Sequence, residues 1–498
     1  MSLQHLPDHP DLSALRRRAK RLRDGARTGD PEALALLLEH HPDADSLLGA
    51  EQDHGAALPL AAAQLALARS YGFASWPTLR RHVDEVRART RRPDQASTAG
   101  PREQLLRAMT VDHSRRGAPD LAAAAALLAA EPHLARSDLA VAAALGDPDA
   151  VRDLLRADPA AVQRESAPYG WPPLLHLCYS RWSGPLPDGK APDHPAVLRL
   201  LLEAGADPNM GFLWDSLPSP FTALTGVFGG GEQGAPPHPS ETALAELLLA
   251  AGADPNDSQT IYDRGAGDTV VRDDTAWLAL LLRAGLGRGD GGPWHRLLAP
   301  RHQSPAQQLS EALLHAARHD LTGRARLLLE SGADPERPST HPLHGGRSPL
   351  REAVRHGAVG VARLLREHGA RGADLTEEDE AFGALLGPAD ALADRTVARE
   401  MQRSHPDLVA QAAALGRPEA VAQLLDLGFA ADARTAEGAT ALHEAAVRGD
   451  HATVELLLAR GADPTLRDPT YGATPAGWAR HTGREELAGL LEAAEQER

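Results

Sequence analysis

The chain has 498 residues, of which 42% are hydrophobic and 4% aromatic, and its formal net charge is −16. The acidic balance argues against nucleic acid as the main partner. The single cysteine, Cys178, excludes an intramolecular disulfide, and the longest apolar run, at residues 121–130, is too short to cross a bilayer. The first residues do not resemble a signal peptide. We therefore expect a soluble, cytoplasmic protein that does not enter a membrane.

Residues 1–98 are predicted to form an N-terminal helical module that could cover the open end of a repeat stack. Leucine and alanine recur at helical spacing from Leu12 to Ala26, and a basic cluster is spread around them (Arg16, Arg17, Arg18, Lys20, Arg21 and Arg23). This cluster has two interpretations, a solvated helix face or an arm that binds phosphate or nucleic acid. The stretch RRPDQASTAG at 91–100 is the predicted linker.

From residue 101 to 498, predicted helix pairs follow one another, and most pairs end at a glycine. The interval from Gly252 to Gly285 is about 33 residues, whereas the interval from Gly205 to Gly252 is clearly longer. Longer intervals in a repeat array indicate inserted loops, which commonly lie on the binding face. We therefore expect an insertion-rich central region at 169–305.

The clearest unit lies at 440–464 and has the sequence TALHEAAVRGDHATVELLLARGADP. Thr440 is placed to cap a first helix, and Gly449 to end it where a positive φ is needed. The second helix is predicted to end at Gly461, and Gly428 precedes Gly461 by the same interval that separates Gly252 from Gly285. A helix pair this short cannot bury its own apolar face, so the unit requires neighbours.

This TxLHxAA…G…LLxxGADP pattern, with its period of about 33 residues, resembles the ankyrin repeat. The resemblance extends over about residues 101–494 and is strongest at 407–494. It implies an all-α solenoid of stacked helix–turn–helix units, with hydrogen bonds from His443 between adjacent repeats. It also implies recognition of another protein or peptide along a concave, loop-lined face. The layout is similar to bacterial ankyrin-repeat proteins, and we expect a monomer that is not an enzyme.

The central repeats depart from this pattern through aromatic-rich loops. Of 18 aromatic residues, 11 fall between Tyr169 and Trp294. They are interpreted either as a surface that binds a partner or as a satellite core that holds the insertions together. In the first interpretation the partner-binding residues are those in or beside the loops: Trp182, Trp214, Phe221, Phe228, Tyr262, Trp294 and His295.

The alternative function is an unrecognised enzyme or a small-molecule binder that uses the same loops. It requires His295, Asp290 and Arg296 to converge on a pocket. The two interpretations differ in whether the loops enclose a pocket or form an open aromatic patch.

Other catalytic or ligand-binding patterns are incomplete, so no cofactor or metal is expected. GPLPDGKA at 184–191 lacks the Ser or Thr of a phosphate-binding loop, and GGGEQG at 229–234 is not preceded by a predicted strand. His443 and Glu444 begin a zinc-binding pattern, but Val447 stands in place of the second histidine. His341 and His344 have no companion ligand at a suitable spacing.

Overall fold

The computed structural model describes residues 4, 6–7, 9–48, 58–113, 119–231, 234–265, 271–299, 302–340, 345–388 and 395–497. His341 and His344 therefore lie outside the described residues. The chain forms two compact units. Unit 1 comprises Met1–Phe228, Pro237–Thr260 and Arg288–Ser304, and unit 2 comprises Gly229–Pro236, Ile261–Gly287 and Pro305–Arg498.

Unit 1 begins with the helices of the N-terminal module, α1 to α5 (Leu12–Arg27, Pro31–His40, Ala44–Leu48, Leu60–Ser70 and Trp76–Arg89). Helix α1 is capped by the carboxylate of Asp11, which accepts from the amide of Ala14 at 2.6 Å. Leu15, Ala19, Leu22 and Ala26 of α1 are buried, and the helix packs against α4. The module has a hydrophobic core of its own that runs from Leu6 to Val83.

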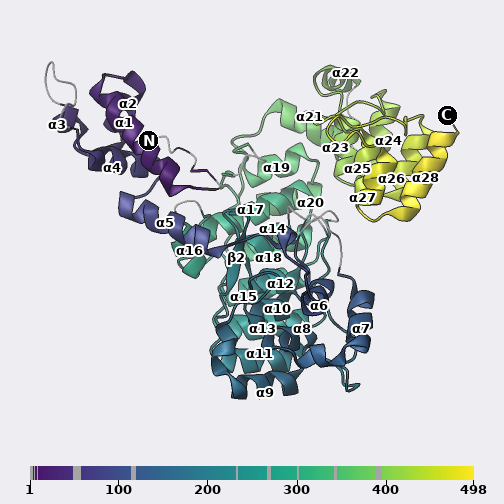
Figure 1. The fold of residues 1–498 in the computed structure, drawn as a ribbon. Helices are drawn as coiled ribbons and strands as arrows, with labels where there is room; N and C mark the ends of the chain where they lie inside the picture. The colour runs from purple at the N-terminus through teal and green to yellow at the C-terminus, as the bar shows by residue number, and fades with distance from the viewer. Residues whose placement is uncertain are drawn as a thin grey trace. The chain divides into compact units, whose positions relative to one another are not determined.

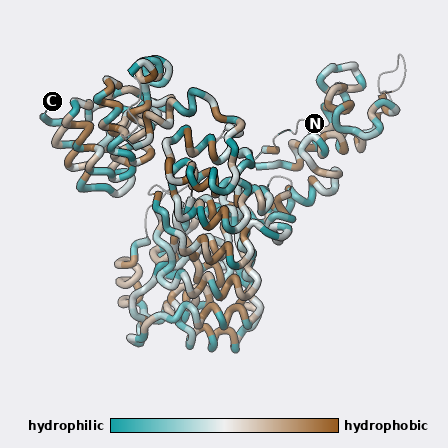
Figure 2. The backbone as a smooth tube through the Cα atoms, turned by 180° about the vertical axis from the view of Figure 1, so that it is seen from behind, coloured by the Kyte–Doolittle hydropathy of each residue, from teal (hydrophilic) through white to brown (hydrophobic). Residues whose placement is uncertain are grey.

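The rest of unit 1 is a stack of helix pairs, in which the first helices α8, α10 and α12 pack in succession. The second helices α9, α11 and α13 form a parallel row (Figure 1). Hydrophobic residues recur along the stacked helices (Figure 2). The helices after the module are α6 Pro101–Met109, α7 Leu121–Ala130, α8 Leu139–Leu145, α9 Pro148–Ala157, α10 Pro173–Tyr179, α11 His194–Glu203, α12 Ala223–Phe228, α13 Glu241–Ala250 and α16 Gly292–Leu298. Short 3₁₀ turns lie at Pro93–Gln95, Pro132–Arg136 and Pro159–Gln163.

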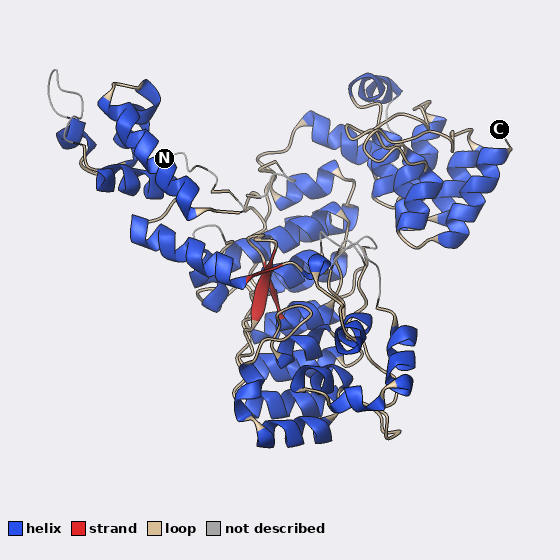
Figure 3. Ribbon diagram, in the orientation of Figure 1, coloured by secondary structure: helices blue, strands red, loops and turns tan. Residues whose placement is uncertain are grey.

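A small sheet, drawn in red in Figure 3, was not expected from the sequence. Strand β1 (Thr90–Arg91) pairs in parallel with β2 (Gly211–Trp214), and β2 pairs with β3 (Pro220–Thr222) in the antiparallel sense. The predicted linker thus begins inside a strand. The pairing of β1 with β2 joins residues more than a hundred positions apart, so no local sequence pattern indicates it.

In unit 2 the helices α23, α25 and α27 pack in succession (Figure 1). Gly449 ends α25 with a φ of 73°, as the sequence predicted. The helices are α15 Ala276–Ala284, α17 Pro305–Arg318, α18 Thr322–Glu330, α19 Pro349–Arg355, α20 Val359–Glu367, α21 Glu377–Leu386, α22 Arg395–Ser404, α23 Leu408–Ala414, α24 Pro418–Asp426, α25 Ala441–Arg448, α26 His451–Ala459, α27 Pro475–His481 and α28 Glu485–Gln496. Helix α14 (Ser258–Asp263) spans the boundary in the chain between the two units.

The all-α repeat fold is confirmed, with the three-stranded sheet as its exception. The predicted division into residues 1–98 and 101–498 stays a prediction, as do the insertion-rich region 169–305 and the regular region 407–494.

Candidate interaction surface

Most of the central aromatic side chains lie inside unit 1 or unit 2. Of the 11 aromatic residues between Tyr169 and Trp294, eight are at most 5% exposed: Tyr169, Trp171, Tyr179, Trp182, Phe212, Phe221, Phe228 and Trp277. The remaining three are Trp214, Trp294 and Tyr262. These burials favour the satellite core over an open aromatic patch.

The satellite core of unit 1 is a chain of ring contacts between the segment just before helix α10 and the β2–β3 hairpin. The rings of Tyr169 and Trp171 stack with centroids 4.4 Å apart, and Trp171 lies 5.0 Å from Phe212. Phe212 in turn stacks on its cross-strand neighbour Phe221 at 5.5 Å. Buried aromatic pairs of this kind stabilise a fold beyond the burial of their area. The insertion is therefore held by its own aromatic residues.

Three residues expected to bind a partner belong to this interior, which corrects the prediction for them. Trp182 is 3% exposed and packs with residues of α6, α7 and α8. Phe221 is 5% exposed in the sheet, and Phe228 is fully buried at the end of α12. A partner cannot reach these rings without opening unit 1.

Trp214 and Trp294 are half-buried. The indole nitrogen of Trp214 donates to the carbonyl of Asp112 at 3.2 Å. Trp294 donates to the carbonyl of Asn209 at 2.9 Å and packs against a cluster that includes Val86 of α5. Both side chains thus bind other segments of unit 1.

The three residues of the alternative pocket do not converge. Asp290 and Arg296 form an exposed ion pair at 2.6 Å, and their side chains are 69% and 59% exposed. The hydrogen bond from the amide of Gly292, followed by that from Arg296, lowers the pKa of Asp290. His295 lies instead against His302, with ring centroids 5.8 Å apart. These three residues therefore do not form an acid–base pair beside a cavity large enough for a substrate.

A hollow does occur among the central loops, and Trp294 lines it together with Asn209, Thr222 and Asp257. It encloses only about 10 Å³, which is about the room needed for one water molecule. Asp257 is held there by Thr222 and by the hydroxyl of Thr225 at 3.2 Å, so its carboxylate already has partners. The hollow does not accommodate a metabolite.

One serine–histidine pair of unit 1 also falls short of a catalytic arrangement. The hydroxyl of Ser166 lies 3.4 Å from Nε2 of His176. Burial lowers the pKa of His176 to about 4. Its buried Nδ1 has no hydrogen-bond partner, so no carboxylate orients the ring as a general base requires.

The C-terminal repeats of unit 2 are linked by His443, as the resemblance implied. Nδ1 of His443 accepts from the amide of Thr440 at 3.2 Å, which leaves Nε2 protonated. Nε2 then donates to the carbonyl of Ala473 in the following repeat at 3.1 Å. Burial lowers the pKa of His443 and keeps the ring neutral. The histidine is structural.

The loop between α26 and α27 presents Tyr471, which the sequence analysis did not single out. Its side chain is 69% exposed, the largest fraction among the large hydrophobic residues that the structure describes. The buried carboxylate of Asp468 holds this loop by accepting from the amides of Thr470 at 2.9 Å and Tyr471 at 2.7 Å. Asp468 also accepts from the indole of Trp478 at 3.0 Å. An aromatic ring on a loop fixed in this way loses little conformational entropy on binding.

The hydrogen bonds to Asp468 also fix its charge. Burial alone would raise the pKa of this carboxyl, but the backbone amides and the indole of Trp478 outweigh burial and lower it. Asp468 therefore stays ionised near neutral pH and keeps its loop ordered.

A second feature of these repeats is a column of equivalent positions on the first helices. Gln411 on α23, Glu444 on α25 and Gly477 on α27 follow one another at equal intervals of one repeat, and all three are partly exposed. Burial, and after it the charge of Glu437, raises the pKa of Glu444 to about 7, although Arg448 acts in the opposite direction. The column therefore carries one carboxyl that titrates near neutral pH.

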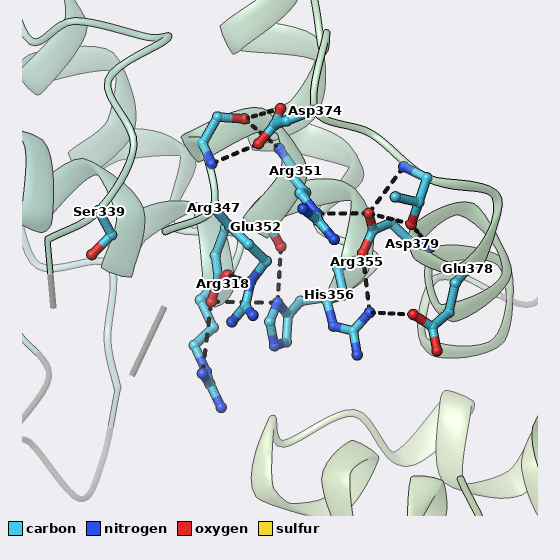
Figure 4. A network of polar contacts seen from close by, with 12 residues as sticks. Arg318, Ser339, Arg347, Arg351, Glu352, Arg355, His356, Asp374, Glu378 and Asp379 are labelled. Carbon is cyan, nitrogen blue, oxygen red and sulfur yellow. Dashed lines mark hydrogen bonds and ion pairs between the residues drawn. The ribbon is translucent and has the colours of Figure 1, made fainter. Parts of the chain in front are cut away.

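Figure 4 shows a buried ionic network on helix α19 of unit 2. Glu352 is fully buried and accepts from Nε of Arg347 at 2.6 Å, and Arg318 lies 3.6 Å from it. Because Arg318 belongs to α17, this carboxylate joins two neighbouring repeats. Breaking a buried pair of this kind is costly, so its role is structural.

A second buried carboxylate continues this network to α21. Asp379 accepts from Arg351 at 2.7 Å and from Arg355 at 3.0 Å, and Thr376 caps the same helix. Burial alone would raise the pKa of Asp379, but its hydrogen bonds lower it overall. The sequence gives no sign of these ion pairs because the arginines lie on α19 and the carboxylate on α21.

In the part of the chain that the structure describes, no helix is long and apolar enough to cross a membrane. The same residues contain no group of three His, Cys, Asp or Glu side chains arranged to hold a metal ion.

Comparison with known proteins identifies the C-terminal repeats. The family described as ankyrin repeats (3 copies) matches residues 402–496. A stretch of 70 residues is 44% identical to Protein PhlB of Serratia liquefaciens. It covers 14% of this chain and 31% of that protein, so the chain spans less than a third of the length of this relative. The chain therefore carries ankyrin repeats at residues 402–496, and modules of this family generally mediate protein–protein interaction.

Proposed function

We propose that the chain is a non-catalytic scaffold that binds a partner protein or peptide through its C-terminal ankyrin repeats, with Tyr471 as an anchor. The observation that carries this proposal is the 69% exposure of Tyr471 on a loop held by Asp468. Tyrosine is enriched among the residues that dominate binding energy, and repeat folds bind through such loops.

Of the seven residues expected from the sequence, Tyr262 has the strongest remaining claim to contact a partner. It is 42% exposed in unit 2, whereas Trp214 and Trp294 are already covered by other segments of unit 1. His295 follows Trp294 on α16, and its ring lies 5.8 Å from that of His302. A partner that binds through the repeats could use Tyr262 as a secondary contact.

The proposal is tested by selecting linear peptides from a phage-displayed library against the full chain. Peptides that bind should lose about tenfold or more in affinity for Tyr471→Ala, because truncation of an aromatic anchor costs about 1.4 kcal/mol or more. Val359→Ala is the matched control, since Val359 is 58% exposed on α20 and lies outside these repeats. Peptides that bind wild type and Tyr471→Ala equally would overturn the proposal.

A further inference from the structure

Helix α1 carries an unusual concentration of positive charge in an acidic protein. Its 16 residues, LSALRRRAKRLRDGAR, contain seven basic side chains and a single acidic one, Asp24. The whole chain has a net charge of −16. The apolar side of α1 is occupied, because Leu15, Ala19 and Leu22 are buried in the N-terminal module.

Three of the basic side chains have structural roles. Arg18 donates to Tyr71 and to Gln4, Arg23 pairs with Asp24, and Arg27 donates to the carbonyl of Leu58 at 2.6 Å. Arg18 and Arg27 connect α1 to other parts of the N-terminal module, and Arg23 forms its ion pair within α1.

The other four, Arg16, Arg17, Lys20 and Arg21, are all exposed. Within the described residues, none of these four side chains makes a hydrogen bond or ion pair. Arg16 and Lys20 are one helical turn apart, as are Arg17 and Arg21, so like charges face each other along the helix and lower its stability. We call these four residues the basic face of α1.

The physical properties of this face favour one kind of anionic partner. Helix α1 has no aromatic residue on which a base could stack, and its buried apolar side cannot insert into a lipid surface. A nucleic acid or a bilayer is an anionic surface that extends far beyond one helix, and the chain outside residues 1–102, with a charge near −18, disfavours such a surface as a partner. A short acidic peptide meets only the basic face.

We propose that the basic face of α1 binds an acidic segment of a partner protein. Guanidinium groups pair with carboxylates through two parallel hydrogen bonds, and three of the four side chains are arginines. This site is separate from the C-terminal repeats, and its contacts do not depend on Tyr471.

The test uses the full chain and a fluorescent, short poly-glutamate peptide as the probe, with binding followed by anisotropy. Wild type is expected to bind at low salt and to lose affinity as salt is added. The variant Arg16→Gln/Arg17→Gln/Lys20→Gln/Arg21→Gln should bind about tenfold more weakly or worse. Its unfolding temperature should stay at or above that of wild type, because like-charge contacts are removed.

The matched control neutralises the same number of exposed basic side chains in unit 2, namely Arg326, Arg363, Arg366 and Arg399. This control should bind the peptide as wild type does. Equal losses in both variants would show that only net charge matters and would overturn the proposal. It would also be overturned if wild type ignored poly-glutamate but bound duplex DNA or phosphatidylserine vesicles.

Discussion

The raised pKa of Glu444 gives the most quantitative prediction. Burial and the charge of Glu437 raise this pKa from 4.5 to about 7. The folded repeats therefore hold the proton more tightly than the unfolded chain. This contribution to stability is present below pH 4.5 and is lost as the pH rises through 7. At full ionisation the lost stability has an upper limit of about 3 kcal/mol, at about 1.4 kcal/mol for each pKa unit.

The variant Glu444→Gln removes the charge and should behave like Gln411, which occupies the equivalent position on α23. Hydrogen exchange of amides in α25, measured on the full chain, reports the local free energy of opening. The protection factor of these amides in the variant, divided by that in wild type, should be up to about 70-fold larger at pH 8 than at pH 5. Glu455→Gln, on the exposed side of α26, should match wild type at both pH values. An equal ratio for Glu444→Gln at both pH values would refute the reasoning.

Burial lowers the pKa of several histidines in unit 1, and in four of them the pKa falls to about 3 or 4 (His113, His176, His194 and His302). The stability of the folded chain should therefore fall as the pH drops from 6.5 toward 4. Each of these four histidines contributes about 1.4 kcal/mol per pH unit in this window, and urea unfolding followed by tryptophan fluorescence should show the loss; a flat stability profile would contradict it. Glu352→Gln should cost about 3–5 kcal/mol because it removes the buried carboxylate that pairs with Arg347 and Arg318, whereas Glu378→Gln, at a side chain 53% exposed, should cost less than about 1 kcal/mol; equal thermal unfolding shifts would argue against the network. A Cβ atom at Gly226 would lie 2.3 Å from the ring of Tyr179, so Gly226→Ala should destabilise by about 1–3 kcal/mol or more. Gly489→Ala in α28 meets no atom within 4 Å and should stabilise by up to about 1 kcal/mol, so a stabilising Gly226→Ala would contradict the close packing.

The repeat fold could be predicted because its signals are local. In the C-terminal repeats, the period of about 33 residues, the glycine that ends α25 and the helix-start threonine are all visible within one unit and its neighbours, and each follows from helix physics. The hydrogen bond from His443 to the next repeat followed from the family resemblance.

The state of the central aromatic residues could not be predicted because it depends on contacts distant in the sequence. Trp214 is covered by Asp112, and Trp294 by a cluster that includes Val86. An aromatic residue in a loop has the same local sequence whether it faces solvent or a neighbouring segment. Most of the aromatic residues in the central region are therefore buried, although their local sequence is compatible with exposed loops.

Tyr471 illustrates the opposite case. It lies in a loop of regular length between Gly461 and Thr474, so the search for insertions passed over it. The available signal was an aromatic residue three positions after an aspartate, in a turn where Asp468 accepts backbone amides. The local signal predicts the turn, but whether the ring of Tyr471 is exposed depends on how the whole repeat packs.

The central claim, that the C-terminal repeats bind a protein or peptide, is tested most directly by hydrogen exchange of the full chain with and without a peptide selected against it. The claim predicts slowed exchange in the loop at 460–474 and in α25 and α27, and the effect should be absent in Tyr471→Ala. Slowed exchange confined to the central loops at 169–305 would contradict it.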